Sequence, residues 1–145
     1  MKIINEARLI FPSLSANESF ARSAASCFAA QLDPTLEELG DIRTAVSEAV
    51  TNAIVHGYPD TLGDIVLRLR LLEGRVLEIQ VKDKGVGIPD VEKARKPLFT
   101  TGGEERSGMG FTIMESFMDG IRVRSAPGKG TSVTLRKQVS PRMRG

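Results

Sequence analysis

Residues 48–57 read EAVTNAIVHG, and this stretch decides the fold because it carries polar side chains inside an otherwise apolar run. Glu48, Asn52 and His56 are spaced four residues apart, which is slightly more than one turn of an α-helix. The three side chains therefore lie on one face of a predicted helix. That face is either exposed to water or lies beside a polar ligand.

Two amphipathic helices are predicted in the first half of the chain, and the second contains this stretch. Ser15 with Glu18 has the pattern of a capping box, and apolar residues follow at helical spacing. The expected core face of this first helix consists of Phe20, Ala24, Cys27, Phe28 and Leu32. Thr35 with Glu38 is a second capping box, and Gly57 ends the long helix that it begins. The expected core stripe of the long helix is Leu39, Ile42, Val46, Ala49, Val50 and Ala53.

Strands are predicted where the hydrophobic period changes to two. Residues 2–11 indicate an edge strand closed by Pro12, and residues 64–83 alternate across a turn at Glu73-Gly74, which predicts a hairpin with one wet face. Residues 121–139 predict a closing hairpin. One face of a short helix before it is marked by Phe111, Met114, Phe117 and Met118. We therefore expect a two-layer α/β sandwich, with helices on one face of a mixed, mainly antiparallel sheet.

The bulk composition indicates one globular domain. The chain has 145 residues, and we expect a single domain over residues 1–136 followed by a basic, disordered tail over residues 137–145. The formal net charge of +2 is too small to indicate direct binding of nucleic acid. Cys27 is the only cysteine, so an internal disulfide is excluded, and its apolar neighbours predict that it is buried. Neither a leader nor a long apolar run occurs, so we expect a cytoplasmic protein without a membrane partner.

Four glycine-containing or polar fragments require a common explanation: EAVTN (48–52), DKGVG (83–87), RSGMG (106–110) and GKGT (128–131). Glycines near a helix start allow backbone N–H groups to approach an anion, which the helix dipole also favours. Ser107, Gly108 and Gly110 are therefore candidate phosphate-binding residues. A Walker-type loop is excluded, because Gly128-Lys129 is followed by another glycine instead of Ser or Thr.

The polar residues of these fragments match the chemistry of a nucleotide. Asn52 offers a neutral oxygen of the kind that Mg²⁺ accepts when substrate phosphates supply other ligands. Glu48, one turn earlier, is placed to accept a proton from an attacking hydroxyl group. Asp83, where a strand breaks into Gly85 and Gly87, is suited to accept a hydrogen bond from an exocyclic amine such as that of adenine. Taken singly, each fragment is also typical of a turn, a tight loop or a solvated helix face.

Together and in this order, the fragments resemble the N, G1 and G2 boxes of the GHKL ATPases, the superfamily of histidine kinases, gyrase B, Hsp90 and MutL. The resemblance implies the histidine-kinase-like (Bergerat) ATPase fold. The matching residues are Glu48 and Asn52 in the first box, Asp83, Gly85 and Gly87 in the second, and Gly108 and Gly110 in the third. Thr131 matches the threonine that follows them, usually near the adenine.

Nearly the whole chain resembles the anti-sigma F factor (SpoIIAB) family of spore-forming bacteria. The resemblance runs through NESFAR (17–22), LDPTLEEL (32–39), SEAVTNAIVHGY (47–58), DKGVGIPDVEKARKPLFTT (83–101) and ERSGMGFTIMESFMD (105–119). It implies a protein serine kinase that uses ATP and Mg²⁺ to phosphorylate an anti-anti-sigma factor. It further implies a homodimer that otherwise holds a sporulation sigma factor inactive, with ATP or ADP bound. The loop after the paired threonines is about one residue shorter than in relatives, which affects the lid more than nucleotide binding.

Further residues near the matching fragments have candidate roles. Arg106 is expected to pair with the terminal phosphate, with a partner contact as the alternative. Thr100 and Thr101 either bind phosphate oxygens or only begin the lid. His56 is expected to be structural, because the C-terminal end of a helix favours its charged form.

Partner contacts are expected on the first helix and the first strand. Glu18 and Arg22 form an i, i+4 pair whose simplest interpretation is a surface salt bridge. In the family the matching arginine lies on the surface that meets the sigma factor and the anti-anti-sigma factor. Residues 1–12 would supply much of the dimer interface.

Three alternative functions remain open. One is the related anti-sigma kinase of the general stress response, which differs in no active-site residue. Another is a detached ATP-binding domain of a histidine kinase, although the only histidine, His56, lies inside the nucleotide box. The third is a sigma-binding module that binds nucleotide without kinase activity.

Overall fold

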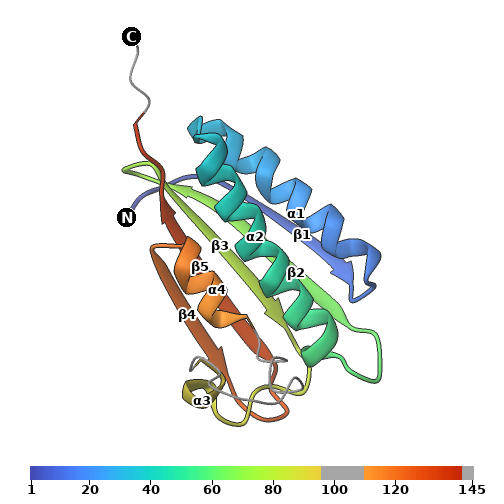
Figure 1. Ribbon diagram of the computed structural model, residues 1–145. Coiled ribbons are helices and arrows are strands. Elements are labelled where there is room, and N and C mark those ends of the chain that lie inside the picture. Colours follow the sequence, from blue (N-terminus) through green and yellow to red (C-terminus); the bar gives the residue numbers. More distant parts are fainter. Residues whose placement is uncertain (96–109, 142–145) are drawn as a thin grey trace.

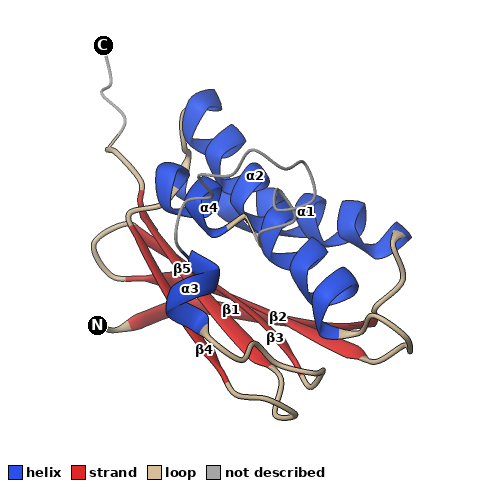
Figure 2. Cartoon of the chain, turned by 60° about the horizontal axis from the view of Figure 1, so that its bottom comes forward, coloured by secondary structure: helices blue, strands red, loops and turns tan. Residues whose placement is uncertain are grey.

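The computed structural model describes residues 1–95 and 110–141, and it contains one five-stranded sheet with helices on one face (Figures 1 and 2). The strands are β1 (Ile3–Pro12), β2 (Asp64–Leu72), β3 (Val76–Asp83), β4 (Gly120–Ser125) and β5 (Thr131–Gln138). The helices are α1 (Ala16–Ala29), α2 (Leu36–Asn52), α3 (Val91–Arg95) and α4 (Phe111–Phe117). A 3₁₀ turn, η1 (Ala30–Leu32), follows α1, and a π-helical turn, η2 (Ala53–Gly57), follows α2. The expected two-layer sandwich is confirmed.

The strand order is β1-β2-β3-β5-β4, and each neighbouring pair is antiparallel. Both predicted hairpins are present, and β1 is an edge strand as expected. β4 runs in the same direction as β3, but β5 lies between them, so the described strands contain no parallel neighbours although we expected a mixed sheet. None of the helices in residues 1–95 and 110–141 is long and apolar enough to span a bilayer.

The long helix α2 forms as its sequence predicts. The N–H of Glu38 donates to Thr35 Oγ1 at 3.0 Å, and the N–H of Thr35 donates to Glu38 Oε1 at 2.9 Å, which completes the capping box. Buried residues of α2 are Ile42, Ala45, Val46, Ala49 and Val50. They pack onto the apolar face of the hairpin, where Ile65, Leu67, Leu69 and Leu71 are buried. Amphipathic burial therefore holds the polar face of α2 in a defined orientation.

Helix α1 differs from its prediction in both its cap and its buried face. The Ser15 side chain makes no capping hydrogen bond, and Glu18 forms an ion pair with Arg22 instead. The buried stripe is Ala21, Ala25 and Ala29. Phe20 is 52% exposed and Cys27 is exposed, so the expectation that they lie in the core was wrong. The reason is packing: α1 lies against α2 (Figure 1), and small alanines allow two helices to approach closely.

Gly40 gives a direct test of packing on α2. A Cβ atom built at this position meets no atom within 4 Å, so the glycine is not required for space inside the chain. We expect Gly40→Ala to raise the free energy of unfolding by about 0.5–1 kcal/mol, because glycine is a poor residue in a helix interior. Urea unfolding of the two proteins measures this difference. A lower urea midpoint for Gly40→Ala would contradict the prediction and show that the added methyl group does not fit.

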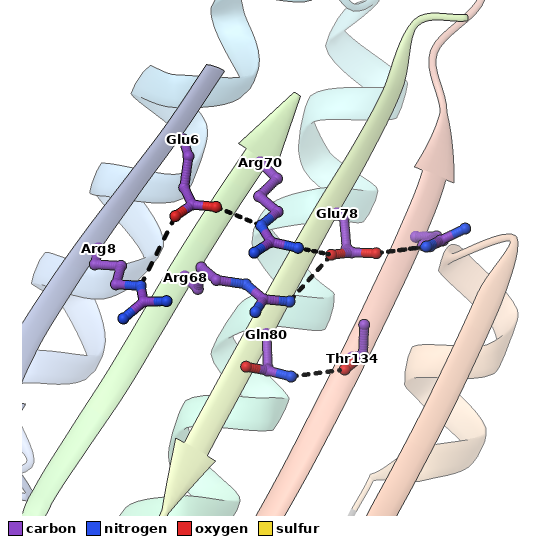
Figure 3. A network of polar contacts seen from close by, with 8 residues as sticks. Glu6, Arg8, Arg68, Arg70, Glu78, Gln80 and Thr134 are labelled. Atoms are coloured by element: carbon purple, nitrogen blue, oxygen red, sulfur yellow. Dashed lines mark hydrogen bonds and ion pairs between the residues drawn. The ribbon is translucent and has the colours of Figure 1, made fainter. Parts of the chain in front are cut away.

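The outer face of the sheet, which the helices leave uncovered, carries a network of ion pairs (Figure 3). The side chain of Glu78 is only 7% exposed, although we expected this face to be open to water. It pairs with Arg68 at 3.2 Å, with Arg70 at 3.7 Å and with Arg136 at 2.7 Å. Arg70 also pairs with Glu6. The network therefore connects β1, β2, β3 and β5 and supports their register.

The end of the domain lies further along the chain than predicted. β5 continues to Gln138, and Val139 is fully buried with its N–H donating to the carbonyl oxygen of Arg75 at 2.9 Å. Lys137 is mostly buried, and its ammonium group donates to the carbonyl oxygen of Phe117 at 2.6 Å. The boundary expected at residue 136 is therefore wrong, because these residues complete the strand. Residues 142–145 lie outside the described residues.

Candidate functional site

A pocket lies between the end of α2 and the sheet, and three of the polar residues predicted for the site, Asn52, Asp83 and Thr131, meet there. Its polar lining consists of Asn52, His56, Asp83 and Thr131. Apolar walls are supplied by Ala49, Val81, Ile88, Phe111 and Val133. The free space among these side chains is about 10 Å³, about what a single water molecule needs.

Asp83 is the buried acid of this pocket, with an exposed fraction of 5%. Its Oδ1 accepts a hydrogen bond from the N–H of Gly85 at 2.9 Å. Gly57 at the end of η2 lies directly against it, because a Cβ atom there would be 2.9 Å from Asp83 Cγ. Burial raises the pKa of Asp83 above its ordinary value, and the N–H groups of Gly85 and Thr131 partly oppose this shift. A buried acceptor of this kind suits recognition of an amine.

The raised pKa of Asp83 predicts how stability depends on pH. The folded protein holds this proton more tightly than the unfolded chain, so stability falls as the pH rises from 3.8 to the raised pKa. We expect Asp83→Asn to be more stable than the parent at neutral pH and to lose this advantage at low pH. Urea unfolding across that range tests the prediction. An Asp83→Asn advantage that is independent of pH would contradict it.

Glycines hold the end of β3 against two other segments. A Cβ atom at Gly85 would lie 1.9 Å from the carbonyl oxygen of Gly57, which accepts the N–H of Val86 at 2.9 Å. Gly87 has a φ of +79°, and a Cβ atom there would lie 2.0 Å from the carbonyl oxygen of Ala126. Larger residues would separate these segments. Gly87 also lines the pocket, and the binding role of Gly85 and Gly87 stays a prediction.

Glu48 lies beside the pocket and not within its lining. It contacts the start of α4, because a Cβ atom at Gly110 would lie 2.2 Å from Glu48 Oε2. Gly110 has a φ of +66°, a conformation that also favours glycine. Burial raises the pKa of Glu48, which suits a group that exchanges protons. The fold therefore brings Glu48 of the first fragment against Gly110 of the third.

The remaining predicted residues fall into two groups. Thr131 lines the pocket, pairs with Asp83 across β3 and β5, and places its Oγ1 2.8 Å from Ser125 Oγ. The others lie outside the described residues, and these are Thr100, Thr101, Arg106, Ser107 and Gly108. Among the described residues, no group of three or more His, Cys, Asp or Glu side chains is arranged to hold a metal ion.

Sequence reasoning missed several residues of the pocket. His56 was expected to be structural, yet it lines the pocket together with Asn52. The spacing of four residues that links them was the available signal. Ile88 and Phe111 reach the pocket from a loop and from the start of α4, and nothing in the local sequence distinguishes them from ordinary core residues.

The pair expected on α1 forms a weak ion pair. Arg22 Nε lies 3.6 Å from Glu18 Oε2, and both side chains are partly exposed. The structure therefore confirms the surface salt bridge. Arg22 also lines a groove that reaches Glu48, which keeps a partner contact as a hypothesis.

Comparison with known proteins identifies the family of the chain. Residues 11–137 match the family model described as histidine kinase-like ATPase domain. The anti-sigma F factor of Geobacillus stearothermophilus is 58% identical over 134 residues, which are 92% of this chain and 92% of that protein. The anti-sigma F factor of Thermoanaerobacter sp. (strain X514) is 54% identical over 140 residues, or 96% and 97% of the two chains.

A solved structure supports the fold alone. The RsbU and RsbW domains of Rv1364c from Mycobacterium tuberculosis match with a TM-score of 0.71 at 21% identity, over 97% of this chain and 34% of that one. The identities to the curated relatives extend over nearly the full length of both partners. The chain therefore belongs to the anti-sigma F factor family and carries its histidine kinase-like ATPase domain.

Proposed function

We propose that this chain is an anti-sigma factor and an ATP-dependent protein serine kinase. Its protein substrate is an anti-anti-sigma factor, and its inhibited partner is a sporulation sigma factor. The observation that carries the proposal is the position of Glu48 and Asn52 on one helix, beside the pocket of the buried Asp83. The names of its relatives as anti-sigma F factors support the partner class.

The pocket residues fit a purine nucleotide. The ionised carboxylate of Asp83 accepts a hydrogen bond from the adenine amino group, and apolar walls such as Val81 and Ile88 contact the base. Because this recognition concerns the base, ATP and ADP are bound by the same contacts. Arg106, Ser107, Gly108 and the pair Thr100-Thr101 are proposed to contact the phosphates.

The amide oxygen of Asn52, which lines the pocket, is the proposed protein ligand of Mg²⁺, an ion that retains water and phosphate ligands. When bound, Mg²⁺ neutralises negative charge on the phosphates. The contribution of the chain is to hold the Asn52 amide toward the pocket through the buried stripe of α2.

The proposed reaction is an in-line transfer of the γ-phosphoryl group. The serine oxygen of the partner forms a bond to the γ-phosphorus, the bond to the bridging oxygen breaks, and ADP leaves. The serine proton passes to the carboxylate of Glu48, whose raised pKa brings it closer to a useful proton acceptor. Catalysis otherwise consists of positioning and charge neutralisation.

A homodimer is part of the proposal, with β1 at its interface. Two outward residues of this edge strand support the assignment, because Ile4 is 60% exposed and Ile10 is 66% exposed. Exposed apolar side chains on an unpaired edge favour contact with a second protein surface.

Incubation with radiolabelled ATP and purified anti-anti-sigma factors tests the function. We expect an acid-stable label on a serine of the sporulation partner. Preferential labelling of the stress-response partner would favour the related stress kinase. Nucleotide binding without any label on serine would favour a sigma-binding module. An acid-labile label on His56 of the chain itself would favour a histidine kinase domain.

A further inference from the structure

A groove between α1 and α2 begins at Glu48 and runs along α2 away from the nucleotide pocket. It has a volume of about 310 Å³ and is lined by Arg22, Gly40, Arg43, Thr44, Ser47 and Glu48. Along α2, Asn52 follows Glu48 and lines the nucleotide pocket, whereas Thr44 and Ser47 precede Glu48 and line the groove. Glu48, the candidate general base, therefore lies where the nucleotide pocket and the groove meet.

Two arginines, Arg22 and Arg43, line this groove and differ in how far their guanidinium groups are already paired. Arg22 Nε is buried without a hydrogen bond, as is its ion-pair partner atom Glu18 Oε2 at 3.6 Å. In the part of the chain that the structure describes, Arg43 has a single hydrogen bond, a long one of 3.4 Å from Nη1 to Ser26 Oγ, and no ion pair. Because Arg22 is paired with Glu18 and Glu48 is itself an acid, it is the Arg43 end of the groove that is complementary to a carboxylate.

The spacing along α2 fixes where such a charge would lie. Arg43 precedes Glu48 by five residues, which is about 7.5 Å along the axis at roughly 1.5 Å per residue. An extended peptide advances about 3.3 Å per residue. If the serine of a bound peptide lies at Glu48, the peptide residue about two positions from that serine therefore lies at Arg43.

We infer that the groove binds the serine-bearing segment of the protein substrate, and that Arg43 selects an Asp or Glu about two residues from the serine. The inference rests on the proposed kinase function and adds a specificity-determining residue to it. The planar fork of arginine pairs with a carboxylate through two parallel hydrogen bonds, which a lysine does not reproduce. Thr44 and Ser47 supply hydroxyl groups along the same wall.

Steady-state phosphorylation of the purified anti-anti-sigma factor tests this role. For Arg43→Ala we expect the KM for the protein substrate to rise about tenfold or more, with kcat and ATP affinity near the parent values. Arg43→Lys should recover part of the loss, because it keeps the charge. Arg122→Ala is the matched control, since Arg122 is exposed on β4 and distant from the groove.

A charge exchange adds a second readout. Arg43→Glu should be nearly inactive on the normal substrate and should regain activity on a substrate whose acidic residue near the serine is replaced by Arg. An unchanged KM for Arg43→Ala, with an active parent enzyme, would overturn the inference and leave the proposed function intact. An inactive parent enzyme that still binds ATP would instead remove the proposed function, and this inference with it.

Discussion

Glu48→Gln is expected to lower the rate of serine phosphorylation about 10²- to 10⁴-fold, because the amide has no basic oxygen to accept the serine proton. ATP affinity should stay near that of the parent, since Glu48 lies outside the lining of the nucleotide pocket. The amide has the same shape as the carboxyl group, so its contact with Gly110 is preserved. The measurement is single-turnover transfer of radiolabel to the anti-anti-sigma factor.

The pH profile separates proton transfer from a structural effect of Glu48. Burial raises the pKa of this carboxyl group, so the parent rate should fall as the pH drops through that raised value. The rate of the Glu48→Gln enzyme should not fall in this pH range. Glu37→Gln is the matched control, because Glu37 is an exposed acid on the same helix. A Glu48→Gln enzyme with the parent rate would exclude Glu48 as the base.

Asn52→Ala is expected to weaken ATP binding in the presence of Mg²⁺ by more than about 100-fold. Loss of a residue that only supports a metal ligand already costs about 10- to 100-fold in affinity, and Asn52 is the proposed ligand itself. Its side chain lines the pocket, and alanine is a better helix former, so the fold should be retained.

Calorimetry with ATP, in the presence of Mg²⁺ and again with a chelator, measures this effect. The two proteins should differ strongly with Mg²⁺ and little without it. Thr51→Ala serves as the control, because the neighbouring Thr51 is exposed on α2. Equal affinities of the parent and Asn52→Ala with Mg²⁺ would refute the assignment.

The sequence predicted those parts of the fold that depend on local pattern. The Thr35 capping box, the stripe of α2 and the alternation of β2 and β3 each follow from spacing within one segment. The convergence of Asp83 and Asn52 on one pocket was also predicted, from the order of the motifs.

The predictions that failed concern contacts between segments. The prediction of the buried face of α1 was wrong. Helix α2 packs closely against α1, and this contact favours small alanines over Phe20. The domain boundary at residue 136 followed the basic composition of the tail, although the closing hairpin was predicted through residue 139; in the structure β5 pairs with β3 through Lys137 and Gln138.

By itself, then, the sequence determined the secondary structure, the sandwich and the identity of the polar groups at the site, since helical and strand periods are local properties of the chain. Only the tertiary structure decided that Gly57 packs on Asp83, that Gly110 packs on Glu48, and that Arg43 and Glu48 share a groove. These contacts arise when separate elements bury their apolar faces against one another, and no local sequence pattern encodes them.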